Sequence, residues 1–288
     1  MIVFTRWLVG ICCLFVGTAN GQTFTKEWQF VRYLTDSEAH DEALFVAQTI
    51  DRRTLTTPQL DSLTYLTGWI HYNTKSLDEA SRALLAVSDT SAFYLKSQYF
   101  GAYCLVFQRK TDSAAVIMPR LPTPDSTFVE LKAVQQAGLA LLQRRYTRYD
   151  SLSRQFSYSS YALSDEETRL GTYRRGLGAQ KRLSPVVAGL LSALVPGLGK
   201  VYARKPKQGI AAFLPVLTLG LLTWEGYRKD GPTSLRFLGF GSLFTVFYVG
   251  NVWGSTLAVK VRREEFNRMY DNKILFDMHI PLRNLLGR

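Results

Sequence analysis

The polarity pattern divides the chain into two parts. From about Thr25 to Gln180, apolar residues recur every three or four positions, which is typical of amphipathic helices. Beyond residue 183 they form long uncharged runs instead, and the run over 237–259 has 23 residues without a charge. About 20 apolar residues suffice for a helix to cross a bilayer. The pattern therefore predicts an all-α protein, with a helical-repeat soluble domain followed by a small multi-span helical membrane bundle.

Turn signals separate the helices expected in the first part. These helices cover roughly 25–35, 38–51, 57–73, 76–88, 91–109, 112–119, 126–145, 147–156 and 164–180. The triplet Asp-Glu-Ala occurs at 41–43 and again at 78–80, and Gly68, Gly101 and Gly138 are 33 and 37 residues apart. Periods of this size indicate stacked helical pairs.

The spacing of Gly68 and Ala80 around a turn resembles the small positions of tetratricopeptide repeats, where two helices cross closely. A plain helical bundle is the alternative. The resemblance implies a concave groove that binds a protein partner. By helix position, the candidate groove residues are Tyr65, Trp69, Tyr72, Tyr94, Tyr99 and Tyr103, although a core role is the commoner one for each.

Three apolar runs follow, over 183–202, 208–224 and 237–259, and they predict two to three membrane spans. In the first run, Pro196 stands beside Gly197, followed by Gly199, and this sequence predicts a break in the helix. A broken helix at membrane depth needs protein or water around its backbone.

Polar and small residues mark the candidate sites of this bundle. Gly250 and Gly254 form a GxxxG pattern, which favours close helix packing. Polar groups at membrane depth are functional candidates by default; we expect Glu225 to reach the interface, and we hypothesise that Asn251 holds the broken first helix. The candidate set is Pro196, Gly197, Gly199, Glu225, Gly250, Asn251 and Gly254.

Together these positions resemble a family of small bacterial membrane domains related to the TM2 domain and to a domain of unknown function from Bacteroidetes. The shared pattern opens as SP..AG.LSA..PG.G..Y and ends as GN.[YW]G. It covers Ser184-Pro185, Ala188-Gly189, Leu191-Ser192-Ala193, Pro196-Gly197, Gly199, Tyr202, Gly209, Phe213, Glu225, Phe247-Tyr248, Gly250-Asn251 and Gly254-Ser255. The resemblance implies a membrane domain and no particular activity.

The N-terminus has the features of a secretory signal over residues 1–21. Arg6 supplies the positive charge, residues 7–16 are apolar, and Ala19 and Gly21 occupy the small cleavage positions. The expected organisation is a signal peptide over 1–21, a tetratricopeptide-like domain over 22–163, a linker helix over 164–182, a membrane domain over 183–259 and a basic amphipathic tail over 260–288. We expect a bacterial membrane location, in the inner membrane, with the N-terminal domain exported to the periplasm.

The distribution of cations bears on the number of spans, because cytoplasmic loops are enriched in Lys and Arg. With an exported domain, three spans place seven flanking cations on each side, whereas two spans place three inside and eleven outside. Three spans are therefore preferred. A cytoplasmic domain with a two-span hairpin satisfies the rule best, but it requires that residues 1–21 are not a signal.

Charge also restricts the partners. Residues 181–288 hold 16 Lys+Arg and 6 Asp+Glu, which is most of the net charge of +12. Because these cations flank apolar runs, we expect anionic lipid head groups as partners and no nucleic acid. Residues 260–273 predict a basic helix along the head groups, with Phe266, Met269 and Tyr270 on its apolar side.

No catalytic constellation is evident, and we expect no enzyme activity, no cofactor and no small-molecule substrate. The three histidines, His40, His71 and His279, are far apart and lack metal-ligand spacing. Cys104, the one cysteine outside the apolar N-terminus, is expected to be a small buried residue.

The sequence supports two functional hypotheses. The first is a membrane-anchored scaffold of the bacterial envelope whose helical domain binds an unidentified protein partner near the bilayer. The second is a membrane-biogenesis or transport factor that acts through the glycine-rich bundle. A truncated chain of residues 1–182 would retain partner binding only under the first hypothesis.

Overall fold

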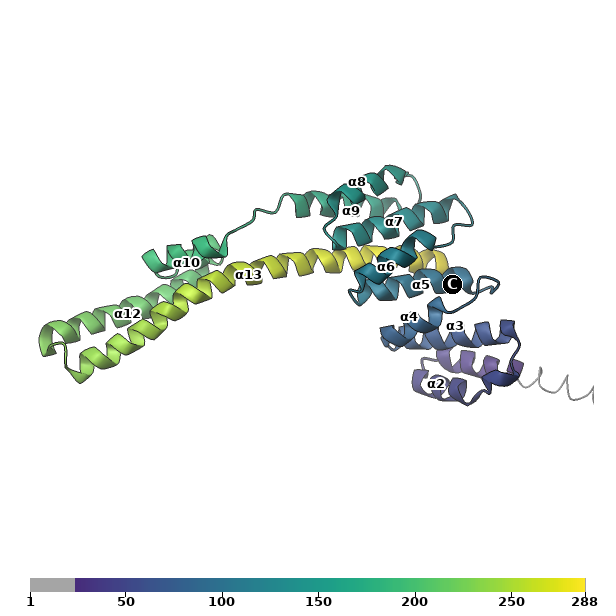
Figure 1. The fold of residues 1–288 in the computed structure, drawn as a ribbon, viewed down its shortest axis with the longest axis horizontal. Coiled ribbons are helices and arrows are strands. Elements are labelled where there is room, and N and C mark those ends of the chain that lie inside the picture. The colour runs from purple at the N-terminus through teal and green to yellow at the C-terminus, as the bar shows by residue number, and fades with distance from the viewer. Residues whose placement is uncertain (1–23, 288) are drawn as a thin grey trace, which may run out of the picture. The chain divides into compact units, whose positions relative to one another are not determined.

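The computed structural model describes residues 24–287, so the predicted signal peptide lies outside it. The all-α class is confirmed: the protein is 80% helical, and no strand occurs in the described range. The elements are a helix over 24–36, α2 His40–Thr49, η1 Arg52–Thr54, α3 Thr57–Asn73, α4 Leu77–Leu85, α5 Tyr94–Phe107, α6 Thr111–Ile117, η2 Met118–Arg120, α7 Ser126–Leu142, α8 Tyr146–Leu152, η3 Ser153–Gln155, α9 Ser164–Gly178, α10 Pro185–Leu194, α11 Leu198–Tyr202, α12 Pro206–Asp230 and α13 Leu235–Leu286 (Figure 1).

The chain forms two compact units. The first unit comprises Met1–Arg174 together with Ile274–Arg288, and the second comprises Arg175–Lys273. The long helix α13 therefore contributes residues to both units. The tail expected over 260–288 is divided between them, since its last part belongs to the first unit.

Local signals in the sequence explain where the helices of the first unit begin. Thr56 and Gln59 form a reciprocal capping box at the start of α3, with Pro58 in the first turn. The Asp125 carboxylate accepts a hydrogen bond of 3.1 Å from the Phe128 amide and so caps α7. The starts of α3 and α7 were recognisable in the sequence because Thr and Asp are favoured N-cap residues.

Four helices of the first unit end in the same turn. Glu38, Lys75, Arg109 and Arg144 each have positive φ, between 58° and 64°. In each case the next amide donates to the carbonyl five residues before it, as in Arg145 N to Ala140 O at 2.8 Å. These turns recur at intervals of 37, 34 and 35 residues, so the chain repeats a helical pair of nearly constant length.

Glycine lets adjacent helices of this unit approach closely. A Cβ at Gly68 would lie 2.9 Å from Leu84 Cγ, and one at Gly101 would lie 2.8 Å from Leu85 Cγ. Both glycines therefore contact α4, one from α3 and the other from α5. Small residues are needed at these two positions because adjacent helices approach closely there, as the sequence predicted for Gly68.

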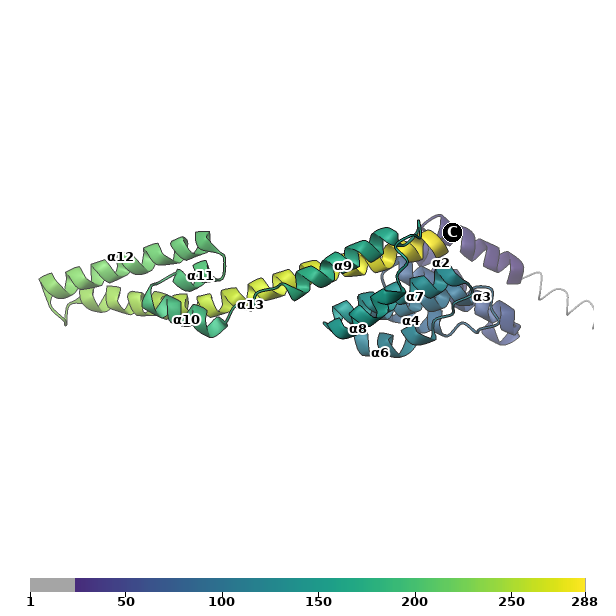
Figure 2. The same cartoon turned by 90° about the horizontal axis from the view of Figure 1, so that it is seen from above.

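The second unit contains two helices, α12 and α13, that are long and apolar enough to cross a membrane, judged by length and composition. They lie side by side and are joined by a short turn (Figures 1 and 2). The run over 183–202 is not a third such helix in the described structure. It is divided into α10, with ten residues, and α11, with five. The preference for three spans is therefore corrected to two candidate spans.

Candidate functional site

Aromatic rings form a row on α3 and α5 of the first unit. Tyr65 stacks on Phe93 with 4.3 Å between ring centroids, and Trp69 contacts Tyr65 and Tyr72 at 6.3 and 5.2 Å. The Lys96 ammonium lies 4.3 Å from the Trp69 centroid, close enough for a cation–π interaction. Burial lowers the pKa of Lys96. The structure thus brings three of the predicted groove residues together.

The end of this row meets the C-terminal segment, Ile274–Leu286, which belongs to the same unit. The Tyr72 hydroxyl and His279 Nε2 are in hydrogen-bond contact, and the Tyr103 ring stacks on His279 at 5.0 Å. Burial, with a smaller effect of Arg283, lowers the pKa of His279. In Figures 1 and 2 this end of α13 is drawn in yellow.

Alternate helices of the unit hold the segment. Tyr103 on α5 donates to Leu275 O at 3.2 Å, and Gln135 on α7 donates to Met278 O at 2.7 Å. A Cβ at Gly138 would lie 2.5 Å from Met278 Sδ, so this glycine makes room for the segment. Two of the predicted groove residues, Tyr72 and Tyr103, therefore contact the C-terminal segment of the chain itself.

One ion pair fixes the segment to α9. Arg169 Nε donates to Asp277 Oδ1 at 2.9 Å, and Arg169 Nη2 donates to Glu166 Oε1 at 2.7 Å. Asp277 is 2% exposed. Burial raises the pKa of Glu166, which shares this cation. Removing Arg169 would leave Asp277 as a buried unpaired charge, which costs about 3–5 kcal/mol in comparable pairs.

The segment is a core element and not a loosely bound peptide. Ile274, Met278 and Leu282 are fully buried. At about 1.5–3 kcal/mol for each buried side chain, the three contribute about 5–9 kcal/mol. That is comparable with the whole stability of a typical domain, about 5–15 kcal/mol. A chain cut at residue 182 loses these side chains, so the truncation that separates the two hypotheses removes part of the core.

Tyr99 lies elsewhere and is a core residue, not a groove residue. It is 1% exposed, and its hydroxyl donates to Pro122 O at 3.0 Å and Phe128 O at 3.2 Å. It therefore ties α5 to the turn before α7. Tyr94 is the first residue of α5.

In the second unit, the predicted break lies between α10 and α11. Gly197 has φ +84°, and a Cβ there would lie 2.2 Å from Gly209 O. A Cβ at Gly199 would lie 1.9 Å from Ala188 O. Only glycine fits at either position, because the conformation or the neighbouring backbone excludes a side chain. Pro196, which precedes them, interrupts the helix as expected.

Asn251 does not hold the break through its side chain. It is 5% exposed, and neither side-chain atom has a hydrogen-bond partner among the described residues. Two serines make the connection instead: Ser192 Oγ donates to Ser255 Oγ at 2.6 Å and accepts from Gly199 N at 2.9 Å. The Tyr248 hydroxyl donates to Ala193 O. Both serines belong to the family pattern given above, but the sequence did not indicate that they contact each other.

The GxxxG pair is not a close helix contact within the described chain. A Cβ at Gly250 would meet nothing within 4 Å, and one at Gly254 would have ordinary contact, 3.6 Å, with Lys200 Cε. The close approaches occur at Gly189 and Gly226, where a Cβ would lie 2.8 Å from Thr256 Cγ2 and 3.1 Å from the Phe237 amide nitrogen.

Glu225 pairs within its own helix. Lys229 Nζ lies 2.7 Å from Glu225 Oε1, one helical turn away at the end of α12 that leads into the turn to α13. The pair is partly exposed. The expectation that Glu225 reaches the membrane interface stays a prediction.

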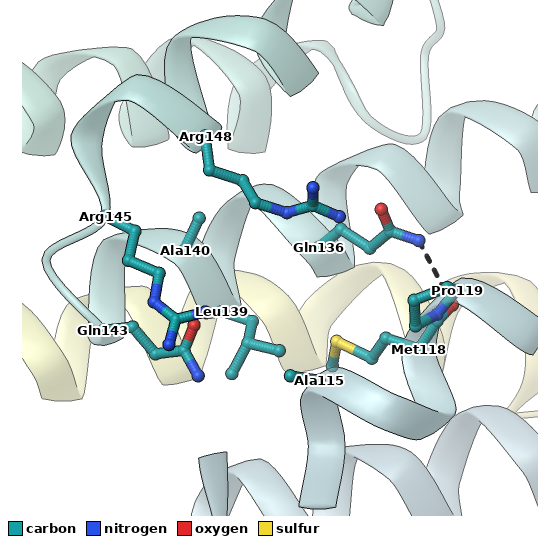
Figure 3. A pocket seen from close by; sticks show the side chains of 9 residues that line it. All are labelled: Ala115, Met118, Pro119, Gln136, Leu139, Ala140, Gln143, Arg145 and Arg148. Carbon is teal, nitrogen blue, oxygen red and sulfur yellow. Dashed lines mark hydrogen bonds between the residues drawn. The ribbon is translucent and has the colours of Figure 1, made fainter. Parts of the chain in front are cut away.

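A small pocket of the first unit lies between α6, α7 and α8. Its walls are Ala115, Met118, Pro119, Gln136, Leu139, Ala140, Gln143, Arg145 and Arg148 (Figure 3). Gln136 Nε2 donates to Met118 O at 3.2 Å across it. Its volume, about 40 Å³, holds a few water molecules at most. An organic substrate does not fit there.

A second cavity, of about 200 Å³, lies in the second unit and is lined by apolar side chains. They are Pro196, Phe213, Val216, Leu217, Gly220, Leu221 and Phe244. Such a lining fits an apolar group and offers no polar anchor.

Candidate chemical groups are sparse in the described part of the chain. No set of three or more His, Cys, Asp or Glu side chains there could hold a metal ion. Cys104 is buried, as predicted, and burial raises its pKa to about 12, so the thiol is protonated at neutral pH.

Comparison with family models, with curated proteins and with solved structures finds no match to this chain.

Proposed function

We propose that this protein is a membrane-anchored interaction protein of a bacterial envelope, without enzyme activity or a cofactor. In this proposal α12 and α13 cross the bilayer as a hairpin, and the stacked helical pairs form a tetratricopeptide-like domain that binds a protein partner near the membrane. Anionic lipid head groups interact with the cations that flank the hairpin. The resemblance to TM2-like membrane domains is consistent with the anchoring role.

One observation carries this proposal: a single helix, α13, contains a span-length apolar run and ends in the core of the helical domain. Separating the helical domain from the hairpin would therefore remove Ile274, Met278 and Leu282 from the core of the domain. Such a connection suits a protein that keeps a binding domain at a membrane.

The same connection constrains topology. Because Ile274–Leu286 packs with α3, α5, α7 and α9, both ends of the hairpin lie in one compartment, and the number of crossings is even. The predicted signal places that compartment outside the cytoplasm, in the periplasm. The eleven cations on that side favour a cytoplasmic domain, which is the alternative.

We place the partner on the aromatic row of α3 and α5. Trp69 and Tyr72 are partly exposed, and Lys96 adds a cation beside them. Aromatic and cationic side chains are enriched where proteins bind one another.

The test is site-specific photo-crosslinking in the full-length protein, in its native membrane. A crosslinking residue in place of Trp69 should give one discrete adduct that Lys96→Glu weakens. The matched control replaces Val116 on α6, which is 57% exposed. Equal adducts from both positions, or none from Trp69, would refute the proposed binding surface.

The second candidate function, a biogenesis or transport factor acting through the bundle, is favoured by the polar Ser192–Ser255 contact within an apolar unit. Replacing both serines with alanine separates the two. The Trp69 adduct should form in this double variant under both hypotheses, but only a factor that acts through the bundle should lose its biogenesis or transport activity.

A further inference from the structure

We infer that α10 and α11 form a re-entrant segment, which enters the bilayer from the side of the helical domain, reaches about its middle and returns to the same side. This inference rests on the proposed crossing of α12 and α13. In this arrangement, the exposed side of α10 contacts the lipid of one leaflet. The segment thereby adds a membrane contact that the α12–α13 hairpin alone does not have.

The entry and the exit of the segment lie at one level. Arg263 Nη2 donates to Leu183 O at 3.2 Å, and Lys205 Nζ lies 3.1 Å from Glu265 Oε1. Residues on both sides of α10–α11 therefore contact α13 within one turn. The Ser184 amide also donates to the Tyr202 hydroxyl at 3.2 Å, which joins the start of α10 to the end of α11.

The far end of the segment lies near the middle of the apolar region. Tyr248, whose hydroxyl donates to Ala193 O, stands 11 residues from each end of the uncharged run over 237–259. At about 1.5 Å per residue, α10 is about 15 Å long, half of a hydrocarbon core of about 30 Å. It is too short to cross, and its length fits one leaflet.

The turn at the far end is supplied with hydrogen bonds from protein. Leu198 N donates to Val195 O at 3.1 Å, and Lys200 N donates to Gly197 O at 3.1 Å. Gly199 N donates to Ser192 Oγ. Irregular backbone at membrane depth is tolerated where protein covers it in this way. Gly197 and Gly199 permit this close packing because neighbouring backbone atoms occupy the space that a Cβ would need at either position.

The outer face of α10 is apolar and exposed. Val186, Leu190 and Leu194 are 68%, 62% and 80% exposed. The exposed apolar side chains of α12 and α13, such as Leu214 and Trp253, belong to the same unit. An apolar surface of this extent beside two span-length helices fits lipid acyl chains, because its exposure to water would be unfavourable.

Cysteine labelling in intact membranes tests the inference. The parent chain carries Cys12→Ser and Cys13→Ser, and its remaining Cys104 is buried. Single variants Lys181→Cys and Lys207→Cys flank the segment, Leu194→Cys marks its far end, and Thr233→Cys marks the turn between α12 and α13. The probe is a membrane-impermeant maleimide, followed by a lipid-soluble one.

We expect positions 181 and 207 to react with the impermeant probe from one side and position 233 from the other, while position 194 reacts only with the lipid-soluble probe. Reaction of position 194 with the impermeant probe from the same side as positions 181 and 207, while position 233 still reacts from the other side, would overturn the inference and leave the hairpin intact. Reaction of all four positions from one side would instead refute the hairpin, and with it the proposed function.

Discussion

Glycine positions in the second unit differ in what a side chain would meet, and the difference is testable one methyl group at a time. Gly197 combines a left-handed backbone with contact to Gly209 O, whereas Gly250 faces open space. In the sequence, both glycines lie in long apolar runs, and only Gly197 is preceded by a proline.

We expect Gly197→Ala to lower the stability of the protein in detergent. The left-handed conformation alone costs an alanine about 1–2 kcal/mol, and the overlap with Gly209 adds to this. Gly250→Ala should be neutral or stabilising, because alanine is favoured over glycine in a helix by about 1 kcal/mol. Thermal unfolding of both variants measures the difference, and equal midpoints would contradict the described break.

A buried carboxyl gives the first unit a pH dependence. Glu167 is fully buried, and its Oε2 accepts from the Tyr158 amide at 2.8 Å. Burial, together with the neighbouring Glu130 carboxylate, raises the pKa of Glu167 to about 7. The folded protein therefore holds a proton there that the unfolded chain releases near its ordinary pKa of 4.5.

The stability that this proton contributes is present below about pH 4.5 and is lost as the pH rises through about 7. Glu167→Gln keeps the group neutral, so we expect its unfolding midpoint to fall less between mildly acidic and mildly alkaline buffer than that of the wild type. Glu42→Gln, at an exposed position of α2, is the control and should follow the wild type. Parallel pH profiles for all three proteins would rule out the raised pKa.

At the scale of elements, periodicity and caps predicted most of the helices. The starts of α3 and α7 followed from Thr56 and Asp125, and the end of α10 followed from Pro196. The turns at Lys75, Arg109 and Arg144 carry residues that seldom adopt positive φ, so their shared conformation had no signal in residue type.

The largest difference concerns the C-terminal segment. Its residues are apolar with Pro281 among them, and no local pattern says which partner they bury against. Burial against α5, α7 and α9 depends on contacts more than 100 residues away in the chain, as between Arg169 and Asp277 or Gln135 and Met278. Of the groove candidates, Trp69 and Tyr72 are partly exposed, whereas Tyr65 and Tyr99 are buried, so a role of any of them in a groove stays a prediction.

Met278→Ala tests the role of this element. Truncating a fully buried methionine costs about 2–5 kcal/mol, so we expect a clear loss of stability in the first unit. Met269→Ala is the matched control, because Met269 lies on the same helix and is 44% exposed. Chemical denaturation in detergent compares the two, and a Met278 variant as stable as the control would show that the segment is not part of the core.

For the whole molecule, composition and run length predicted the division into a helical domain and an apolar unit. The number of candidate spans required the structure, because a run of 20 residues with one charge has the length of a span whether or not Pro196 and Gly197 divide it. The return of the chain from the apolar unit to the helical domain likewise depends on tertiary packing.

The central claim is that the chain ends in the compartment where its helical domain lies, having crossed the bilayer an even number of times. Two single cysteines test it most directly, Asp89→Cys in an exposed turn of the domain and a cysteine added after Arg288. In sealed membranes an impermeant maleimide should label both from the same side. Labelling of the two positions from opposite sides would contradict the account.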